Sequence, residues 1–362
     1  MTTPRFRPAL DTIPSYKAGR PPAAGQPAGQ PRYKLSSNEN PYPPLPGVVA
    51  RATEAAEAMN RYPDMGVTRL HEALAAKYSV STDQIASGAG SVAVLYHLLQ
   101  ASCDDGDEVV YAWRSFEAYP IAAKLTGATS VHVPVDADAR HDLPSMLEAI
   151  TDKTKVVIVC TPNNPTGTSV HQAELEAFLA GVPGHVLVAI DEAYHEFVTD
   201  PETPDALELA RGRDNVVVLR TFSKAYGLAG LRVGYAVAPA PIAEAIRKCA
   251  LPFGVSSIAQ AAAVASLDSE AELLERVDEL VKERSRVHDA LRQQGWDIPD
   301  AQGNFVWFGL GDATVGFAEA CDAAGVSVRP FAGDGARVTI GEPEANDLLL
   351  DVAQRWHSEH TG

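Results

Sequence analysis

The feature that most constrains the fold is an alternation of short apolar runs with helix-like segments. The runs are rich in β-branched residues and apolar on both faces: Glu108–Tyr111, Val156–Cys160, Val186–Ile190, Val216–Leu219 and Val233–Ala238. The segments with a helical pattern are 48–59, 67–78, 92–102, 115–125 and 171–180. Strands with two apolar faces are typical of a parallel sheet covered by helices. The alternation therefore predicts a layered α/β domain.

Two stretches outside this alternation have a different texture. Residues 4–46 are rich in Pro, Gly and Gln, which cannot sustain a long helix, so we expect an extended arm over the surface. Residues 256–294 are rich in Ala and Glu and predict one or two long helices. A smaller α+β unit should follow, with strands at Asn304–Phe308 and Arg337–Ile340.

The length of 362 residues exceeds the size at which single cores usually stop growing, which favours two subdomains. We predict an N-terminal arm at 1–34, a large domain at 35–255 and a small C-terminal domain at 256–362. The formal net charge of −17 argues against nucleic acid and against anionic membranes as partners, because phosphate groups require basic surface.

The cysteines argue for a reducing compartment. They lie far apart and form no CxxC pair, so we expect neither structural zinc nor a disulfide framework. The four are Cys103, Cys160, Cys249 and Cys321. The N-terminus has no apolar signal segment, and no apolar run has membrane-spanning length. We therefore expect a soluble, cytoplasmic protein with no metal site and no membrane partner.

Polar side chains follow three of the predicted strands where each strand ends. Asn164 comes after the second run, Asp191 and then Tyr194 after the third, and Lys224 after the fourth. Ligands of open parallel sheets bind beyond the carboxyl ends of the strands, so these groups should share one rim. The set suits a pyridine-ring cofactor that carries an aldehyde and a phosphate. Lys224 would condense with the aldehyde, and Asp191 would keep the ring nitrogen protonated, so that the ring accepts electrons from the substrate's Cα.

Asn164 and Tyr194 would hydrogen-bond to the hydroxyl of the same ring. Each of these residues alone has an ordinary structural explanation, such as a helix cap or a solvated charge, and only the combination is specific. Donors for the phosphate should come from a Gly-rich turn that opens the helix at 92–102, with its free N–H groups and its dipole. Charge-assisted hydrogen bonds from the segment around Lys224 would complete this site. The predicted phosphate-binding residues are Gly88, Ala89, Gly90, Thr221, Ser223 and Arg232.

Three motifs resemble those of one enzyme family. They are Asn163–Gly167, Asp191–Tyr194 and Ser223–Tyr235, and the likeness extends from Ser36–Pro41 to Arg337–Gly341. In this combination the chain is similar to the fold-type I, pyridoxal-phosphate-dependent aminotransferases of class II. Within them it resembles the histidinol-phosphate aminotransferase branch, which includes aromatic amino acid aminotransferases. The resemblance implies a mostly parallel seven-stranded sheet between helices, a smaller α+β domain and the cofactor pyridoxal 5′-phosphate.

The resemblance also implies roles for single residues. Phe116 matches the aromatic side chain that stacks on the cofactor ring, and Tyr62 matches a tyrosine that reaches the cofactor phosphate of a neighbouring subunit, which implies a homodimer. Arg337 matches the arginine that binds the α-carboxylate of the substrate. Tyr16 and Asn40 are assigned to the substrate end in the same way. Arg329 lies near this pattern, and an ordinary surface cation is an equal alternative for it.

The substrate is open at this point. Relatives that act on histidinol phosphate usually carry Tyr-Asn where this chain has Phe253-Gly254. Losing a phenol and an amide removes contacts to a substrate phosphate, and Phe253 offers apolar surface to an aromatic ring. We therefore expect phenylalanine, tyrosine and tryptophan as amino donors and 2-oxoglutarate as the acceptor. Histidinol phosphate is the alternative substrate. A decarboxylase is a weaker alternative, and a ligand-sensing regulator would need a basic DNA-binding domain.

Overall fold

The computed structural model describes residues 6–16, 19 and 32–360. A seven-stranded sheet forms the centre of the larger part, in the order β2-β8-β7-β6-β5-β3-β4. The neighbours from β7 to β4 are parallel, whereas β8 is antiparallel to both β7 and β2. The strands are β2 (Ile85–Gly88), β3 (Glu108–Trp113), β4 (Thr129–Pro134), β5 (Thr154–Cys160), β6 (Leu187–Asp191), β7 (Val216–Thr221) and β8 (Gly234–Val237).

The predicted mostly parallel sheet is confirmed, with one correction. The run Val233–Ala238 was expected to resemble the others, but as β8 it runs antiparallel to its neighbours. The reason is the connection between β7 and β8, which consists of a loop and a short 3₁₀ helix (Ala229–Leu231). A connection without a long helix allows an antiparallel neighbour, whereas a parallel strand would need a long crossover. One strand of this sheet was not named in advance, the edge strand β4, which is only partly buried and lacks a continuous apolar run.

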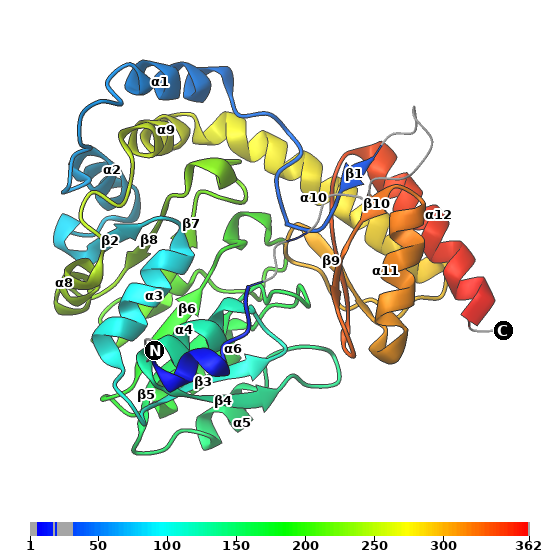
Figure 1. Cartoon of the computed structure of the whole chain (residues 1–362), viewed down its shortest axis with the longest axis horizontal. Helices are drawn as coiled ribbons and strands as arrows, with labels where there is room; N and C mark the ends of the chain where they lie inside the picture. The colour runs from blue at the N-terminus through cyan, green and yellow to red at the C-terminus, as the bar shows by residue number, and fades with distance from the viewer. Residues whose placement is uncertain (1–5, 17–18, 20–31, 361–362) are drawn as a thin grey trace, which may run out of the picture.

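Helices cover both faces of this sheet (Figure 1). Alternate strand residues enter two separate apolar clusters, so that Val109 and Val156 pack on one face and Val110 and Val157 on the other. This two-sided burial is the reason for the unbroken apolar runs in the sequence. The helices are α1 (Pro46–Ala56), α2 (Thr68–Tyr78), α3 (Ser91–Ser102), α4 (Ala118–Thr126), α5 (Leu143–Glu148), α6 (Gln172–Gly181), α7 (Ala206–Ala210) and α8 (Ala240–Cys249).

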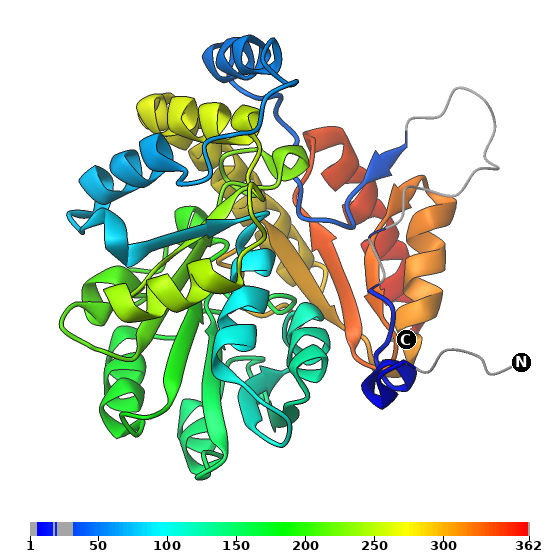
Figure 2. The same cartoon turned by 60° about the vertical axis from the view of Figure 1, so that its left-hand side comes forward.

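The C-terminal part is a smaller α+β layer beside the large sheet (Figures 1 and 2). The predicted long helical stretch is two helices, α9 (Ser257–Asp268) and α10 (Glu270–Gln293), and the second runs from the large part into the small one. Three antiparallel strands form its sheet in the order β11-β12-β9. The remaining elements are β9 (Phe305–Gly309), α11 (Thr314–Ala323), β10 (Val326–Ser327), β11 (Arg329–Phe331), β12 (Gly335–Thr339) and α12 (Pro343–His360).

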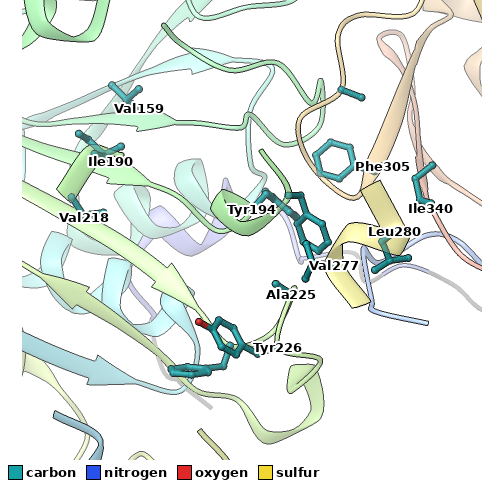
Figure 3. Packing of buried hydrophobic residues seen from close by; sticks show 14 of the residues in the cluster. Val159, Ile190, Tyr194, Val218, Ala225, Tyr226, Val277, Leu280, Phe305 and Ile340 are labelled. Carbon is teal, nitrogen blue, oxygen red and sulfur yellow. The ribbon is translucent and has the colours of Figure 1, made fainter. Parts of the chain in front are cut away.

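The two parts share one continuous apolar core. Val159, Ile190 and Val218 of the large sheet lie on the same side as Tyr194, whose ring meets Phe305 of the small sheet edge-on at 5.0 Å (Figure 3). Contacts also cross the two predicted domain boundaries, because α9 packs on α1 and β1 (Tyr33–Lys34) pairs with β10. The boundaries at 34/35 and 255/256 stay predictions.

The expectation of a surface arm is wrong for its last part. Leu35, Ser36 and Asn38 are buried, between the large sheet and the small one. The reason is their hydrogen bonding, since Asn38 exchanges hydrogen bonds with Thr339 and the carbonyl of Ser36 accepts one from Arg337. Residues 17–18 and 20–31 of the predicted arm lie outside the described residues. None of the helices in the described ranges combines the length and apolar character needed to cross a bilayer.

Candidate active site

A cavity of about 250 Å³ lies beyond the carboxyl ends of β5, β6 and β7, where the strand ends were expected to meet. Ten of the predicted site residues line it together. They are Tyr16, Phe116, Asn164, Asp191, Tyr194, Thr221, Ser223, Lys224, Arg232 and Arg337. The structure therefore brings together side chains from distant parts of the sequence. Tyr16 and Arg337, the two that are farthest apart, are separated by 321 positions.

Lys224 follows β7 and is half-buried in this cavity. Its Nζ donates to the carbonyls of Ser37 (3.2 Å) and Asn38 (3.3 Å) and lies 5.7 Å from the centre of the Tyr194 ring. Burial, with the nearby positive charge of Arg337, lowers the pKa of this amine to about 7. A large fraction of the amine is therefore neutral near physiological pH, as a nucleophile or a proton acceptor must be.

Asp191, the last residue of β6, is buried. One carboxylate oxygen accepts a hydrogen bond from the Tyr119 hydroxyl at 2.8 Å, while the other, Oδ1, has no partner. Burial raises the pKa of this carboxyl to about 6. A buried acceptor without a donor costs free energy, so the position fits a ligand that brings an N–H group or a positive charge.

The side chains of Asn164 and Tyr194 are held in place by residues from the start and the end of the chain. The amide oxygen of Asn164 accepts from Arg337 Nη1 at 2.5 Å. The Tyr194 hydroxyl accepts from Asn38 Nδ2 at 2.9 Å, and burial raises the pKa of this phenol. Tyr194 therefore stays protonated and keeps its own O–H as a donor, so both residues can reach the hydroxyl of a bound ring.

An anion-binding region lies where the Gly-rich turn meets the segment after Lys224. Gly90 precedes the first residue of α3 with a φ of 84°, and no side chain caps this helix end. Arg232 donates to Ser223 Oγ (3.2 Å) and to the carbonyl of Ala89 (3.4 Å). The uncapped N–H groups, the helix dipole and the guanidinium together favour a phosphate.

Close packing leaves no room for a side chain at two glycines around this turn. A Cβ on Gly90 would lie 2.4 Å from Arg232 Nη2, and one on Gly234 would lie 2.2 Å from the backbone nitrogen of Ser91. Gly88 ends β2, and its carbonyl accepts from the N–H of Gly90 at 2.7 Å. The three turn residues Gly88, Ala89 and Gly90 thus shape this region without lining the cavity.

Arg337 is better placed than Arg329 to bind a carboxylate in the cavity. Its side chain is buried and donates to Asn164 and to the carbonyl of Ser36, whereas its Nε has no partner. Burial lowers its pKa, but an arginine stays charged. Arg329 also lines the cavity, but it is paired with Glu117.

The remaining predicted residues fall into two groups. Tyr16 and Phe116 cover the cavity and touch edge to face, with ring centres 6.4 Å apart. Three others, Asn40, Tyr62 and Phe253, do not line the cavity. Asn40 donates to the carbonyl of Ala225 at 3.0 Å, and Tyr62 stacks on Phe253 at 4.6 Å on the surface.

Three residues of the site were not singled out from the sequence. Tyr119 binds Asp191, Asn38 binds Tyr194, and Glu117 binds Arg329. All three stand in segments with other assigned residues, so proximity in sequence was the available signal. Pattern alone could not show that their side chains contact the residues of the site, because that depends on how distant segments pack.

Comparison with known proteins agrees with this geometry. The family model of aminotransferase class I and II matches residues 31–352. The chain belongs to this family. An aromatic amino acid aminotransferase of Streptomyces coelicolor is 58% identical over 358 residues, 99% of each chain. One of Thermobifida fusca is 53% identical over 353 residues, 98% of this chain and 97% of that one.

A solved structure provides the comparison for the cofactor of this class I and II aminotransferase. The histidinol-phosphate aminotransferase of Sinorhizobium meliloti, in complex with pyridoxal 5′-phosphate, has a TM-score of 0.85 at 27% identity, covering 98% of this chain and 99% of that one. The residues of the present aminotransferase suit such a group. The partnerless Asp191 Oδ1 suits a protonated ring nitrogen, the region at Gly90 and Arg232 suits a phosphate, and Lys224 suits an aldehyde.

Proposed function

We propose that this chain is a pyridoxal-phosphate-dependent aromatic amino acid aminotransferase. It would transfer the amino group of phenylalanine, tyrosine or tryptophan to 2-oxoglutarate, giving the aryl 2-oxo acid and glutamate. The observation that carries the chemistry is the meeting of a lysine of lowered pKa, a partnerless buried carboxylate and an uncapped helix end in one cavity. Relatives with that name, 58% and 53% identical over nearly the whole chain, support the choice of substrate.

Each residue has a part in this proposal. The cofactor, when bound, supplies an electron sink for the bond broken at the substrate's Cα. Lys224 Nζ would accept the proton from Cα of the amino donor in the first half-reaction and donate a proton to Cα of the new amino acid in the second, and its position within the cavity solves the problem of proximity. Arg337 binds the α-carboxylate through a charge-assisted pair. Asp191 and Tyr194 would hold the cofactor ring at its nitrogen and its hydroxyl, and Phe116 would cover the ring.

An apolar wall supports an aromatic side chain over a phosphorylated one. Phe116, Phe331 and Tyr16 line the cavity that holds Lys224. Such rings bind an aromatic substrate through edge-to-face and stacked contacts. A histidinol phosphate site would instead need a second cluster of phosphate donors. A decarboxylase could use the same lysine and carboxylate, and release of carbon dioxide from the amino acid would reveal it.

The proposal includes a homodimer in the cytoplasm. Tyr62 is 83% exposed and stacks on Phe253, and exposed apolar side chains stand close to these two residues in the sequence, namely Met59, Met65 and Leu251. Exposed apolar surface of this kind marks an interaction site. A second copy would bury it and bring Tyr62 to the phosphate of the neighbouring site. The four cysteines are all free, as is usual in a reducing compartment.

The decisive experiment compares kcat/KM for phenylalanine and for histidinol phosphate, each with 2-oxoglutarate. We expect at least a tenfold preference for phenylalanine, which corresponds to about 1.4 kcal/mol in transition-state binding. A preference for histidinol phosphate would overturn the substrate and leave the cofactor chemistry standing. The Lys224→Ala variant should lose turnover with every amino donor. Transamination by that variant would contradict the assignment of Lys224.

A further inference from the structure

Two arginines face each other across the small sheet at the edge of the cavity. Arg329 of β11 and Arg337 of β12 are directly opposite in the antiparallel register. Side chains of such a pair stand on the same face, and like charges in this arrangement destabilise a sheet. Both also line the cavity. The site therefore carries two positive charges close together, although an amino acid with an aromatic side chain offers one carboxylate.

Glu117 supplies the negative charge that balances the second arginine. Its carboxylate pairs with the guanidinium of Arg329, and the two side chains are 29% and 10% exposed. Glu117 belongs to the loop between β3 and α4, next to Phe116, which covers the cavity. The pair thus joins the aromatic wall of the large domain to the arginine strand of the small sheet.

An aminotransferase has to accept two substrates in one cavity, and here they differ in charge. This step rests on the proposed function, in which the donor is aromatic and the acceptor is the dicarboxylate 2-oxoglutarate. A desolvated guanidinium without a partner beside an apolar ring would cost free energy. A second carboxylate without a cation would cost free energy in the same way. A single fixed arrangement of charges serves only one of these substrates.

We propose that Glu117 is a specificity-determining residue that stands in for the second carboxylate of the acidic substrate. It pairs with Arg329 while an aromatic substrate occupies the cavity. When the dicarboxylate binds, its second carboxylate takes the place of Glu117 on Arg329, and the half-exposed Glu117 turns to solvent. Arg337 holds the α-carboxylate of both substrates throughout. The pair thereby keeps the net charge around Arg329 the same in both half-reactions.

Binding of two unreactive ligands to the cofactor-loaded enzyme tests the pair directly. Glutarate represents the dicarboxylate and 3-phenylpropionate the aromatic substrate, and calorimetry gives each Kd. In the double variant Glu117→Gln/Arg329→Gln the Kd of glutarate should rise about tenfold or more, as expected for losing a charge-assisted hydrogen bond. The Kd of 3-phenylpropionate should change by less than about threefold. An equal weakening of both ligands would overturn the proposal, because a structural role predicts it.

The single variant Glu117→Gln should change the affinity for glutarate in the opposite direction. Glutarate no longer competes with an internal carboxylate and should bind about threefold to tenfold more tightly, while 3-phenylpropionate binds more weakly. Unchanged or weaker glutarate binding would contradict the proposal, and this variant keeps the test valid if the double variant fails to fold. Arg114→Gln is the matched control. Arg114 lies over the same Phe331 ring and pairs with Asp334, but it does not line the cavity.

Separate half-reactions distinguish this inference from the proposed function. Rates of cofactor conversion with phenylalanine and with glutamate are followed by absorbance in wild type and in the double variant. The ratio of the two should shift about tenfold toward phenylalanine in the double variant. A wild type that reacts with glutamate but not with phenylalanine would overturn the proposed function and the inference together. A wild type that reacts with both, and a variant with the same ratio, would overturn the inference alone.

Discussion

At Asp191, a feature that suits cofactor binding lowers the free energy of unfolding of the protein. Its carboxylate is buried with one oxygen unpartnered, and its pKa is raised to about 6 from 3.8. The folded chain therefore holds a proton that the unfolded chain releases between these two values. Hence the free energy of unfolding falls as pH rises through this window, and the whole cost is present above about pH 6.

The variant Asp191→Asn should remove this cost while it weakens the cofactor site. An asparagine keeps an oxygen for the Tyr119 hydroxyl and carries no charge. Without cofactor, the variant should be more stable than wild type by about 1–3 kcal/mol near pH 7.5 and equal to it near pH 4. Its affinity for pyridoxal phosphate should fall at least about tenfold. Urea unfolding at the two pH values and a fluorescence titration measure both effects, and equal stability at both pH values would contradict the argument.

Lys224 contributes a cost with the opposite dependence on pH. Its pKa is lowered to about 7 from 10.5, so the unfolded chain binds a proton that the folded chain lacks between these values. The free energy of unfolding should rise with pH through this window, and the cost is greatest below about pH 7.

We therefore expect Lys224→Met to raise the Tm of the cofactor-free protein by about 2–5 °C near pH 6.5. The gain should shrink steadily toward pH 10, because both states of the wild-type amine then approach neutrality. Differential scanning calorimetry across this range checks the sign. Surface Lys282→Met is the control, since it pairs with Glu279 on an exposed face of α10. A gain from Lys224→Met that did not depend on pH would exclude the titration as its cause.

Between elements, the contact of β8 with the start of α3 positions the phosphate region. Gly234 of β8 lies so near this helix end that a methyl group would be 2.2 Å from the nitrogen of Ser91. Backbone atoms cannot move aside as a flexible side chain can. The absence of a side chain at residue 234 thus fixes where the free N–H groups of α3 point.

The substitution Gly234→Ala should push α3 away from β8. We expect a loss of about 1–3 kcal/mol in the free energy of unfolding, as in other overpacked sites, and weaker binding of pyridoxal phosphate. Gly230→Ala is the matched control, because nothing lies within 4 Å of a Cβ there. Urea unfolding and cofactor titration of both variants test this, and the same small effect from each would show that the contact is unimportant.

The sequence predicted best those strands that are buried evenly on both faces. The strands β5, β6 and β7 were predicted within two residues at each end, since burial on both faces leaves an unbroken apolar run. The same strand ends led to Asn164, Asp191 and Lys224. Edge strand β4 was missed because one-sided burial removes that run. The buried path of Ser36 and Asn38 was also missed, because it depends on hydrogen bonds to residues near the other end of the chain.

Across the whole molecule, the proposed dimer has consequences that variants can separate. Met65→Glu and Leu251→Glu place a charge on apolar side chains that are 65% and 75% exposed. We expect monomers at micromolar concentration, together with a loss of most activity, because each site would lack its neighbour's Tyr62. Val315→Glu, on the opposite α11, is the control at 48% exposure. Light scattering after size exclusion measures the mass, and an active monomer would contradict the shared site.

Mixing two defective variants provides a second test at this scale. Lys224→Ala should be inactive, and Tyr62→Ala should bind pyridoxal phosphate about tenfold more weakly. In a mixed dimer, both defects fall in one site if Tyr62 reaches the neighbouring subunit, and the other site is intact. Unfolding and refolding the two together should therefore restore activity above that of either variant at low cofactor concentration. No restoration would place Tyr62 in its own subunit's site or outside both.

The hydrogen bonds between Asn38 and Thr339 join positions 301 residues apart. Closing so long a loop is among the last events available to a folding chain, since most of the polypeptide has to be made first. Until β12 has been synthesised, the chain lacks Arg337 and also Thr339, which holds the segment that accepts hydrogen bonds from Lys224. Substrate binding is thereby withheld until synthesis has passed β12. A chain cut short before that strand would lack Arg337 and should turn over no amino acid.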